Sequence, residues 1–224
     1  SIDGFIMSLS KETQFKGDFN HITEVMNQGM PVVMFDRVTD EILCDKVIID
    51  DKAAAYEAVQ SMIDKGRKKI ALVTTMDYIS VGKLRTDGYT KALLDNSIPF
   101  DENLILKIDD IVNSELTIST FLKDKAIDAV FAVNELFAVT IIKTATKLGL
   151  NVPNDIAVIA FTDGIISKYS TPTITTVSQR GKKMGAKAAK ILINRLESEE
   201  EEEGEENYRT EVIATHLIER ESTN

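Results

Sequence analysis

The sequence predicts an α/β protein of two doubly wound, parallel-sheet subdomains, between which the chain crosses more than once. First, short apolar runs alternate with helical stretches of about ten to fifteen residues, the pattern of βαβ units. Second, residues 156–161 are almost continuously apolar, as in a strand covered on both faces. Third, one isolated helix and late strands follow residue 163, which is unusual for a single sheet.

The individual elements follow from apolar runs and their breakers. Gly149 and Pro153 stop one helix before the run that begins at residue 156. Strands are expected at 2–7, 32–35, 47–49, 70–73, 104–106, 129–133 and 156–161. Helices are expected at 21–28, 52–65, 83–94, 114–123 and 135–148.

The last third of the chain departs from this alternation. Residues 169–178 read as a loop with a short extended segment, 182–195 as a helix, and 208–218 as a strand pair or long strand. We expect residues 1–49 and 164–197 to form the N-terminal subdomain and 50–161 and 207–224 the C-terminal one. Residues 198–206 are expected to form an acidic loop.

The formal charge of −10 is concentrated in one place. Eight glutamates lie between residues 197 and 206, and without them the charge would be −2. Such a run is typical of a solvated or disordered loop. Because the chain has no basic stripe, we expect this part of the protein to bind nucleic acid poorly by itself.

Other function classes have little support. The only cysteine, Cys44, excludes an internal disulfide and favours a reducing, cytoplasmic location, while His21 and His216 lack partners for a metal site. No glycine-rich phosphate loop, serine elbow or Cys–His pairing is present, so we expect neither an enzyme nor a cofactor. No apolar run approaches the roughly 20 residues that span a bilayer, so no membrane partner is expected.

Seven segments, in order, carry a resemblance to a known family. The most specific is Val152-Pro-Asn-Asp-Ile-Ala-Val-Ile-Ala-Phe-Thr-Asp163, which follows Leu148-Gly149. The others are Ile2-Asp-Gly-Phe-Ile-Met7, Met30-Pro-Val-Val-Met-Phe-Asp-Arg37, residues 47–73, Arg85-Thr-Asp-Gly-Tyr89, Asp128-Ala-Val-Phe-Ala-Val-Asn-Glu135 and Leu217-Ile-Glu-Arg-Glu-Ser222. Together they resemble the LacI-type bacterial transcription regulators.

The resemblance implies a periplasmic-binding-protein-like fold of type I with an effector cleft between its subdomains. The family begins with a helix-turn-helix headpiece, a hinge helix and the first strand–helix units, and Ser1 falls after all of these. We therefore expect an incomplete N-terminal subdomain, in which residues 2–7 have an unpaired or intermolecularly paired edge.

The resemblance also implies a ligand-binding set: Ser8, Asp36, Arg85, Asn134, Thr162 and Asp163. Two residues depart from the family pattern, since Thr162 replaces an acid and Glu135 replaces an aspartate. Simpler roles remain open for four of the six. Asp36 could cap a turn, Arg85 could be an exposed helix residue, Asn134 is placed to cap a helix, and Asp163 could only end a strand.

The expected function is the effector-sensing and dimerisation region of a LacI-type transcription regulator. The effector would be a small polar metabolite, expected to be a sugar or sugar-like, and operator DNA would bind through a headpiece outside this chain. A homodimer is expected because helix-turn-helix proteins of this kind read paired half-sites. The alternative is an extracytoplasmic sugar-binding protein of a transporter, which shares the fold.

Overall fold

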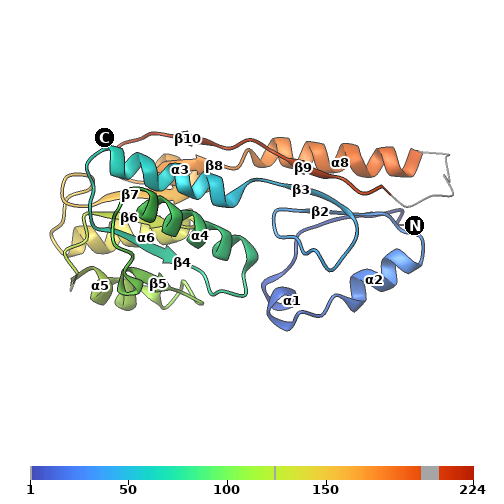
Figure 1. Ribbon diagram of the computed structural model, residues 1–224, viewed down its shortest axis with the longest axis horizontal. Coiled ribbons are helices and arrows are strands. Elements are labelled where there is room, and N and C mark those ends of the chain that lie inside the picture. Colours follow the sequence, from blue (N-terminus) through green and yellow to red (C-terminus); the bar gives the residue numbers. More distant parts are fainter. Residues whose placement is uncertain (1, 124, 198–206) are drawn as a thin grey trace. The chain divides into compact units, whose positions relative to one another are not determined.

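The computed structural model describes residues 2–123, 125–197 and 207–224, which divide into two compact units. Unit 1 contains residues 1–50, 78–81 and 180–214, and unit 2 contains 51–77, 82–179 and 215–224. Each unit has its own sheet (Figure 1). The predicted fold class, two α/β subdomains with parallel sheets and several crossovers, is confirmed.

Unit 1 is built on a four-stranded parallel sheet with the strand order β1-β2-β3-β9. Helix α8 packs against β1, β2 and β3. Val32 and Met34 of β2 belong to a buried hydrophobic cluster that also contains Ile22 of α2. The strands are β1 (Phe5–Met7), β2 (Val32–Phe35), β3 (Asp45–Ile48) and β9 (Thr210–Val212), and the helices are α1 (Lys11–Lys16), α2 (Asn20–Asn27) and α8 (Gly181–Glu197).

Among the described residues β1 pairs with β2 alone, and the unpaired or intermolecularly paired edge expected on its other side stays a prediction. Ile6, in the middle of this strand, is exposed. An open edge of a parallel strand offers backbone donors and acceptors to another strand.

Unit 2 is built on a six-stranded sheet with the order β10-β8-β7-β6-β4-β5, in which only β10 runs antiparallel. Strands β4, β6 and β7 are buried along their whole length. The strands are β4 (Ile70–Thr74), β5 (Ile105–Lys107), β6 (Ala129–Ala132), β7 (Ala157–Phe161), β8 (Thr175–Ser178) and β10 (His216–Ile218), and the helices are α3 (Asp51–Asp64), α4 (Ser80–Asp95), a 3₁₀ turn (Glu102–Leu104), α5 (Ser114–Lys123), α6 (Glu135–Lys147) and α7 (Ile165–Tyr169).

The segment Arg85-Thr-Asp-Gly-Tyr89 fixes α4 against its neighbours. A methyl group on Gly88 would lie 2.2 Å from the backbone oxygen of Lys52, so α3 and α4 approach more closely than any side chain permits. The fully buried Tyr89 donates its hydroxyl to the Ile70 carbonyl at 2.8 Å. This explains why glycine and tyrosine stand side by side in the motif.

The expected subdomain boundaries need correction at three places, the smallest of which is residues 78–81, which belong to unit 1. Residues 164–179 belong to unit 2, because β8 pairs in parallel with β7. Residues 207–214 belong to unit 1, because β9 pairs with β3. The strand pair or long strand expected within 208–218 is therefore two strands in different sheets, and helix α1, which was not among the expected helices, follows β1. The expected acidic loop, 198–206, lies outside the described residues.

Candidate functional site

The carboxyl ends of β6, β7 and β8 lie side by side in unit 2, because these three strands are neighbours and parallel. Polar residues follow each strand: Asn134 after β6, Thr162 and Asp163 after β7, and Gln179 after β8. Ligands of open α/β sheets bind at such edges. We call Asn134, Thr162 and Gln179, together with Arg85 of α4, which contacts the ends of β6 and β7, the strand-end set.

Asn134 is the N-cap of α6, which is one of the roles expected for it from the sequence. Its Oδ1 accepts a hydrogen bond of 2.8 Å from the backbone N–H of Phe137. This bond satisfies one of the free N–H groups at the helix start. The Nδ2 group of Asn134 has no hydrogen-bond partner among the described residues, so it can still donate outward.

Thr162 adopts a left-handed backbone conformation, with φ at 78°. This conformation is strained for a β-branched residue, and such strain concentrates at functional positions. Thr162 Oγ1 donates to Gln179 Oε1 at 3.0 Å. Gln179 was missed in the sequence because nothing marks a glutamine at the end of a threonine-rich segment whose pairing with β7 is not evident.

Arg85 is buried, which excludes its interpretation as an exposed helix residue. Its Nε donates to Asp51 Oδ1 at 2.7 Å and its Nη1 donates to the Val133 carbonyl at 2.7 Å. The centre of the guanidinium lies 3.8 Å from the centroid of the Phe161 ring. Since Val133 and Phe161 lie at the ends of β6 and β7, the guanidinium reaches the same edge as Asn134 and Thr162.

Asp163 is held inside unit 2. Its Oδ1 accepts from Arg220 Nη2 at 2.6 Å and from Thr176 Oγ1 at 3.2 Å, and Lys168 Nζ lies 3.3 Å from Oδ2. Burial alone would raise the pKa of this carboxyl group, but the hydrogen bond and charge of Arg220, with Lys168 and Thr176, hold the pKa below its ordinary value. The carboxylate therefore ties the end of β7 to the C-terminal segment.

The contacts of Glu135 at this edge, like those of Gln179, were not predicted from the sequence. Its carboxylate accepts hydrogen bonds from the backbone N–H and hydroxyl of Ser167 in α7. A methyl group on Gly164 would lie 2.1 Å from Glu135 Oε1, so the Glu135 carboxylate would have to move to admit a side chain here. Both carboxylates that follow β6 and β7 are thus engaged within unit 2.

In unit 1, Ser8 and Asp36 follow β1 and β2, as expected. Ser8 Oγ accepts from the backbone N–H and the Nε of Arg37, at 3.4 and 3.3 Å. Asp36 has a φ of 60°, and its carboxylate lies 3.8 Å from Arg37 Nε, beyond hydrogen-bond length. Ser8 and Asp36 are neighbours at one edge because β1 and β2 pair in parallel.

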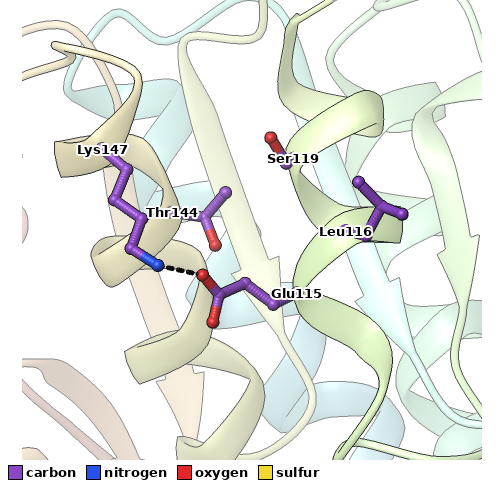
Figure 2. A pocket seen from close by; sticks show the side chains of 5 residues that line it. All are labelled: Glu115, Leu116, Ser119, Thr144 and Lys147. Atoms are coloured by element: carbon purple, nitrogen blue, oxygen red, sulfur yellow. Dashed lines mark hydrogen bonds and ion pairs between the residues drawn. The ribbon is translucent and has the colours of Figure 1, made fainter.

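A separate shallow pocket of about 340 Å³ lies between α5 and α6 (Figure 2). It is lined by Glu115, Leu116, Ser119, Thr144 and Lys147, and includes none of the six expected site residues. Glu115 accepts from both Lys143 and Lys147, and these bonds lower the pKa of Glu115 to about 2. The Thr144 hydroxyl is buried without a hydrogen-bond partner in the structure.

Within the described parts of the chain, no three or more His, Cys, Asp or Glu side chains are grouped so that they could hold a metal ion. Over the same residues, the helices are all too short or too polar to cross a membrane.

The chain forms two α/β units with polar residues at the strand ends of each, and comparison with known proteins shows the family to which it belongs. The family model of a periplasmic binding protein-like domain matches residues 59–223. The regulators CelR of Thermobifida fusca and MalR of Clostridium butyricum are 32% and 34% identical to this chain over 178 residues. These matches cover 79% and 78% of this chain and 51% of each relative.

Solved structures of regulators are also similar to this chain. A complex of the transcriptional regulator CelR with cellobiose superposes with a TM-score of 0.86 at 26% identity, over 99% of this chain and 66% of that one. A LacI-family regulator from Enterococcus faecium with bound ribose gives 0.84 at 25% identity, over 99% and 80%. The chain belongs to the periplasmic binding protein-like domain family, in the form found in LacI-type transcription regulators. It spans about half the length of the curated relatives it matches.

Proposed function

We propose that this chain is the effector-sensing region of a LacI-type transcription regulator. A small polar metabolite would bind at the strand-end set of unit 2 and change the affinity of the whole protein for operator DNA. The observation that carries the proposal is the meeting of Arg85, Asn134 and Thr162 at one sheet edge. They come from three different elements of a chain whose relatives are regulators.

Ser8, Asp36 and Asp163 remain proposed ligand contacts, and the proposal is stronger for Ser8 and Asp36 than for Asp163. Ser8 and Asp36 share one edge of the unit 1 sheet, and among the described residues the Asp36 carboxylate has an ion-pair contact with Arg37 Nε at 3.8 Å and no hydrogen bond. Asp163 is weaker as a direct contact, because its oxygens already meet Arg220, Thr176 and Lys168. We assign Asp163 a positioning role at the end of β7.

The effector class follows from the relatives only as a proposal. The CelR structure contains cellobiose and the Enterococcus faecium regulator contains ribose. We therefore propose a sugar or sugar derivative as the effector here. The same relatives favour the regulator over a transporter's binding protein, because the curated ones are named as regulators. The relatives likewise favour a binding protein over an enzyme. We also propose a cytoplasmic location, because regulators of this kind act in the cytoplasm.

We also propose that the whole protein is a homodimer that contacts itself through one face of unit 2. Helix α6 packs against both α5 and α7. These helices and the turn before α5 expose five large apolar residues: Val112, Leu116, Leu136, Ile165 and Tyr169. We call them the apolar face. Clustered exposed apolar side chains mark interaction surfaces, and the α5–α6 pocket lies beside Leu116.

The test is calorimetric titration of the full-length protein with a panel of sugars and sugar derivatives, with operator affinity measured in parallel. Wild type should bind at least one ligand, and that ligand should change operator affinity. Because losing one partner of a buried polar set leaves the others unpaired, Asn134→Ala should weaken ligand binding by roughly ten- to a hundredfold. Ligand binding without any change in operator affinity would contradict the regulator.

A further inference from the structure

The strand-end set has more hydrogen-bond donors without a partner than acceptors. Asn134 uses its oxygen to cap α6, and Gln179 uses its oxygen to accept from Thr162. Each amide is therefore left with its NH₂ group, which has no partner among the described residues. Arg85 carries only donors, and its Nη2 likewise has no hydrogen-bond partner in the described structure.

The carboxylates at the same edge already take part in contacts within unit 2. Glu135 Oε2 accepts both hydrogen bonds from Ser167, and Asp163 Oδ1 accepts from Arg220 and Thr176 while Lys168 Nζ lies 3.3 Å from Oδ2. Thr162 stands where a family acid would supply a carboxylate, and its hydroxyl proton points to Gln179. Apart from the remaining lone pairs of its amide and hydroxyl oxygens, the strand-end set offers donors to a ligand and no charged acceptor.

A donor-rich edge distinguishes between ligand groups. A hydroxyl group of a neutral sugar can accept from an NH₂ group, but its own proton then needs an acceptor. A carboxylate or phosphate has only acceptors to satisfy, and hydrogen bonds to a charged oxygen are shorter and stronger than neutral ones. The α6 N-terminus adds a positive helix-dipole end beside Asn134.

We infer that the effector presents an anionic oxygen group, a carboxylate or a phosphate, to Asn134, Gln179 and Arg85 at the ends of β6–β8. This inference rests on the proposed function and narrows its ligand class to a sugar acid, a sugar phosphate or a comparable anion. It also assigns Gln179 as a specificity-determining residue. The structure supplies the arrangement: two amides whose NH₂ groups have no partner among the described residues follow the strands on either side of β7, and a guanidinium that is only 6% exposed is held against Phe161.

Two isosteric variants test the inference without removing an internal bond. Gln179→Glu keeps the oxygen that accepts from Thr162, and Asn134→Asp keeps the oxygen that caps α6, but each replaces the outward NH₂ group by a negative oxygen. Asn154→Asp is the matched control, since Asn154 is exposed in the turn before β7, at the opposite end of the same sheet. Unfolding midpoints should be similar for wild type and all three variants.

The probes are matched sets titrated calorimetrically into the full-length protein: glucose, glucuronate and glucose 6-phosphate, then ribose and ribose 5-phosphate, with inorganic phosphate and acetate alone. An anionic member should bind at least about tenfold more tightly than its neutral parent. Gln179→Glu and Asn134→Asp should each weaken that binding by about ten- to a hundredfold, and Asn154→Asp should leave it unchanged. Comparing glucuronate with glucose 6-phosphate distinguishes a carboxylate from a phosphate.

Tighter binding of a neutral sugar than of its anionic partners, with Gln179→Glu improving it, would overturn the inference and leave the proposed function intact. Unchanged anion binding in both isosteric variants would also overturn it. If no probe binds wild type and none alters operator affinity, the proposed function falls together with the inference.

Discussion

Arg85 Nε and Asp51 Oδ1 form an ion pair of 2.7 Å in the interior of unit 2, where their side chains are only 6% and 4% exposed. The two residues are 34 positions apart and join the start of α3 to α4. Because Arg85 also donates to the Val133 carbonyl, the ion pair connects two helices to the end of β6. A residue expected to contact ligand is thus also part of the core.

This ion pair changes the expected effect of Arg85→Ala. A residue that only contacted ligand could be changed to alanine with a roughly ten- to a hundredfold loss of effector binding and little cost in stability. Since the variant leaves Asp51 buried without its cation, the free energy of unfolding should fall by about 3–5 kcal/mol. Urea denaturation measures this. Lys91→Ala, which breaks the exposed Lys91–Asp95 pair, should leave the midpoint unchanged. Equal effects of both variants would contradict the structural role.

Asp163 should make unit 2 sensitive to acid. Its pKa in the folded chain lies below the ordinary value of 3.8, chiefly because Arg220 outweighs the opposing effect of burial. Its contribution to stability is therefore present above pH 3.8 and is lost as the pH falls through the lower folded pKa. Asp163→Asn should lower the melting temperature at neutral pH and flatten the decline below about pH 4. An unchanged acid decline in this variant would show that other carboxylates dominate.

Two helical glycines should respond oppositely to alanine. Gly88→Ala places a methyl group 2.2 Å from the Lys52 carbonyl, so α3 and α4 must separate, at a cost of about 1–3 kcal/mol. Gly185 in α8 has no heavy atom within 4 Å of the added methyl group. Gly185→Ala should therefore stabilise the protein by about 0.5–1 kcal/mol through helix propensity. Thermal or urea unfolding decides the signs, and a tolerated Gly88→Ala would refute the close packing.

The apolar face predicts which surface holds the proposed homodimer together. Leu116→Glu introduces a charge at a 77% exposed leucine of α5 and should shift the full-length protein towards monomer in light scattering. Leu94→Glu is the matched control, because Leu94 is a 59% exposed leucine of α4, outside the face. Dissociation by Leu94→Glu but not by Leu116→Glu would place the contact elsewhere.

Local patterns in the sequence predicted most of the fold. Gly149 and Pro153 correctly delimited α6 and β7, and the position of Asn134 correctly identified a helix cap, because these signals act within a few residues. The threonine-rich β8 was assigned to the wrong unit. Its buried Thr175 is satisfied by Ser222, Thr223 and the Arg220 carbonyl, more than forty residues away, and no local pattern encodes such partners.

The sequence predicted that the candidate residues lie at strand ends, but it did not predict which partners they have there. The resemblance identified the strand ends, yet the partners of Arg85, Asp163 and Gln179 depend on strand order and on contacts distant in sequence. Those partners determine which groups remain for a ligand. Sequence patterns alone could not reveal that the oxygens are used internally and the NH₂ groups are not.

The most direct test of the central claim is amide chemical-shift mapping by NMR on this chain during titration with the probe that binds best in calorimetry. Saturable shifts should concentrate at Asn134, Thr162 and Gln179, and Asn134→Asp should raise the probe concentration needed for half-saturation by about ten- to a hundredfold. Shifts confined to Glu115, Ser119 and Thr144, around the α5–α6 pocket, would contradict the account by placing the ligand at a different site.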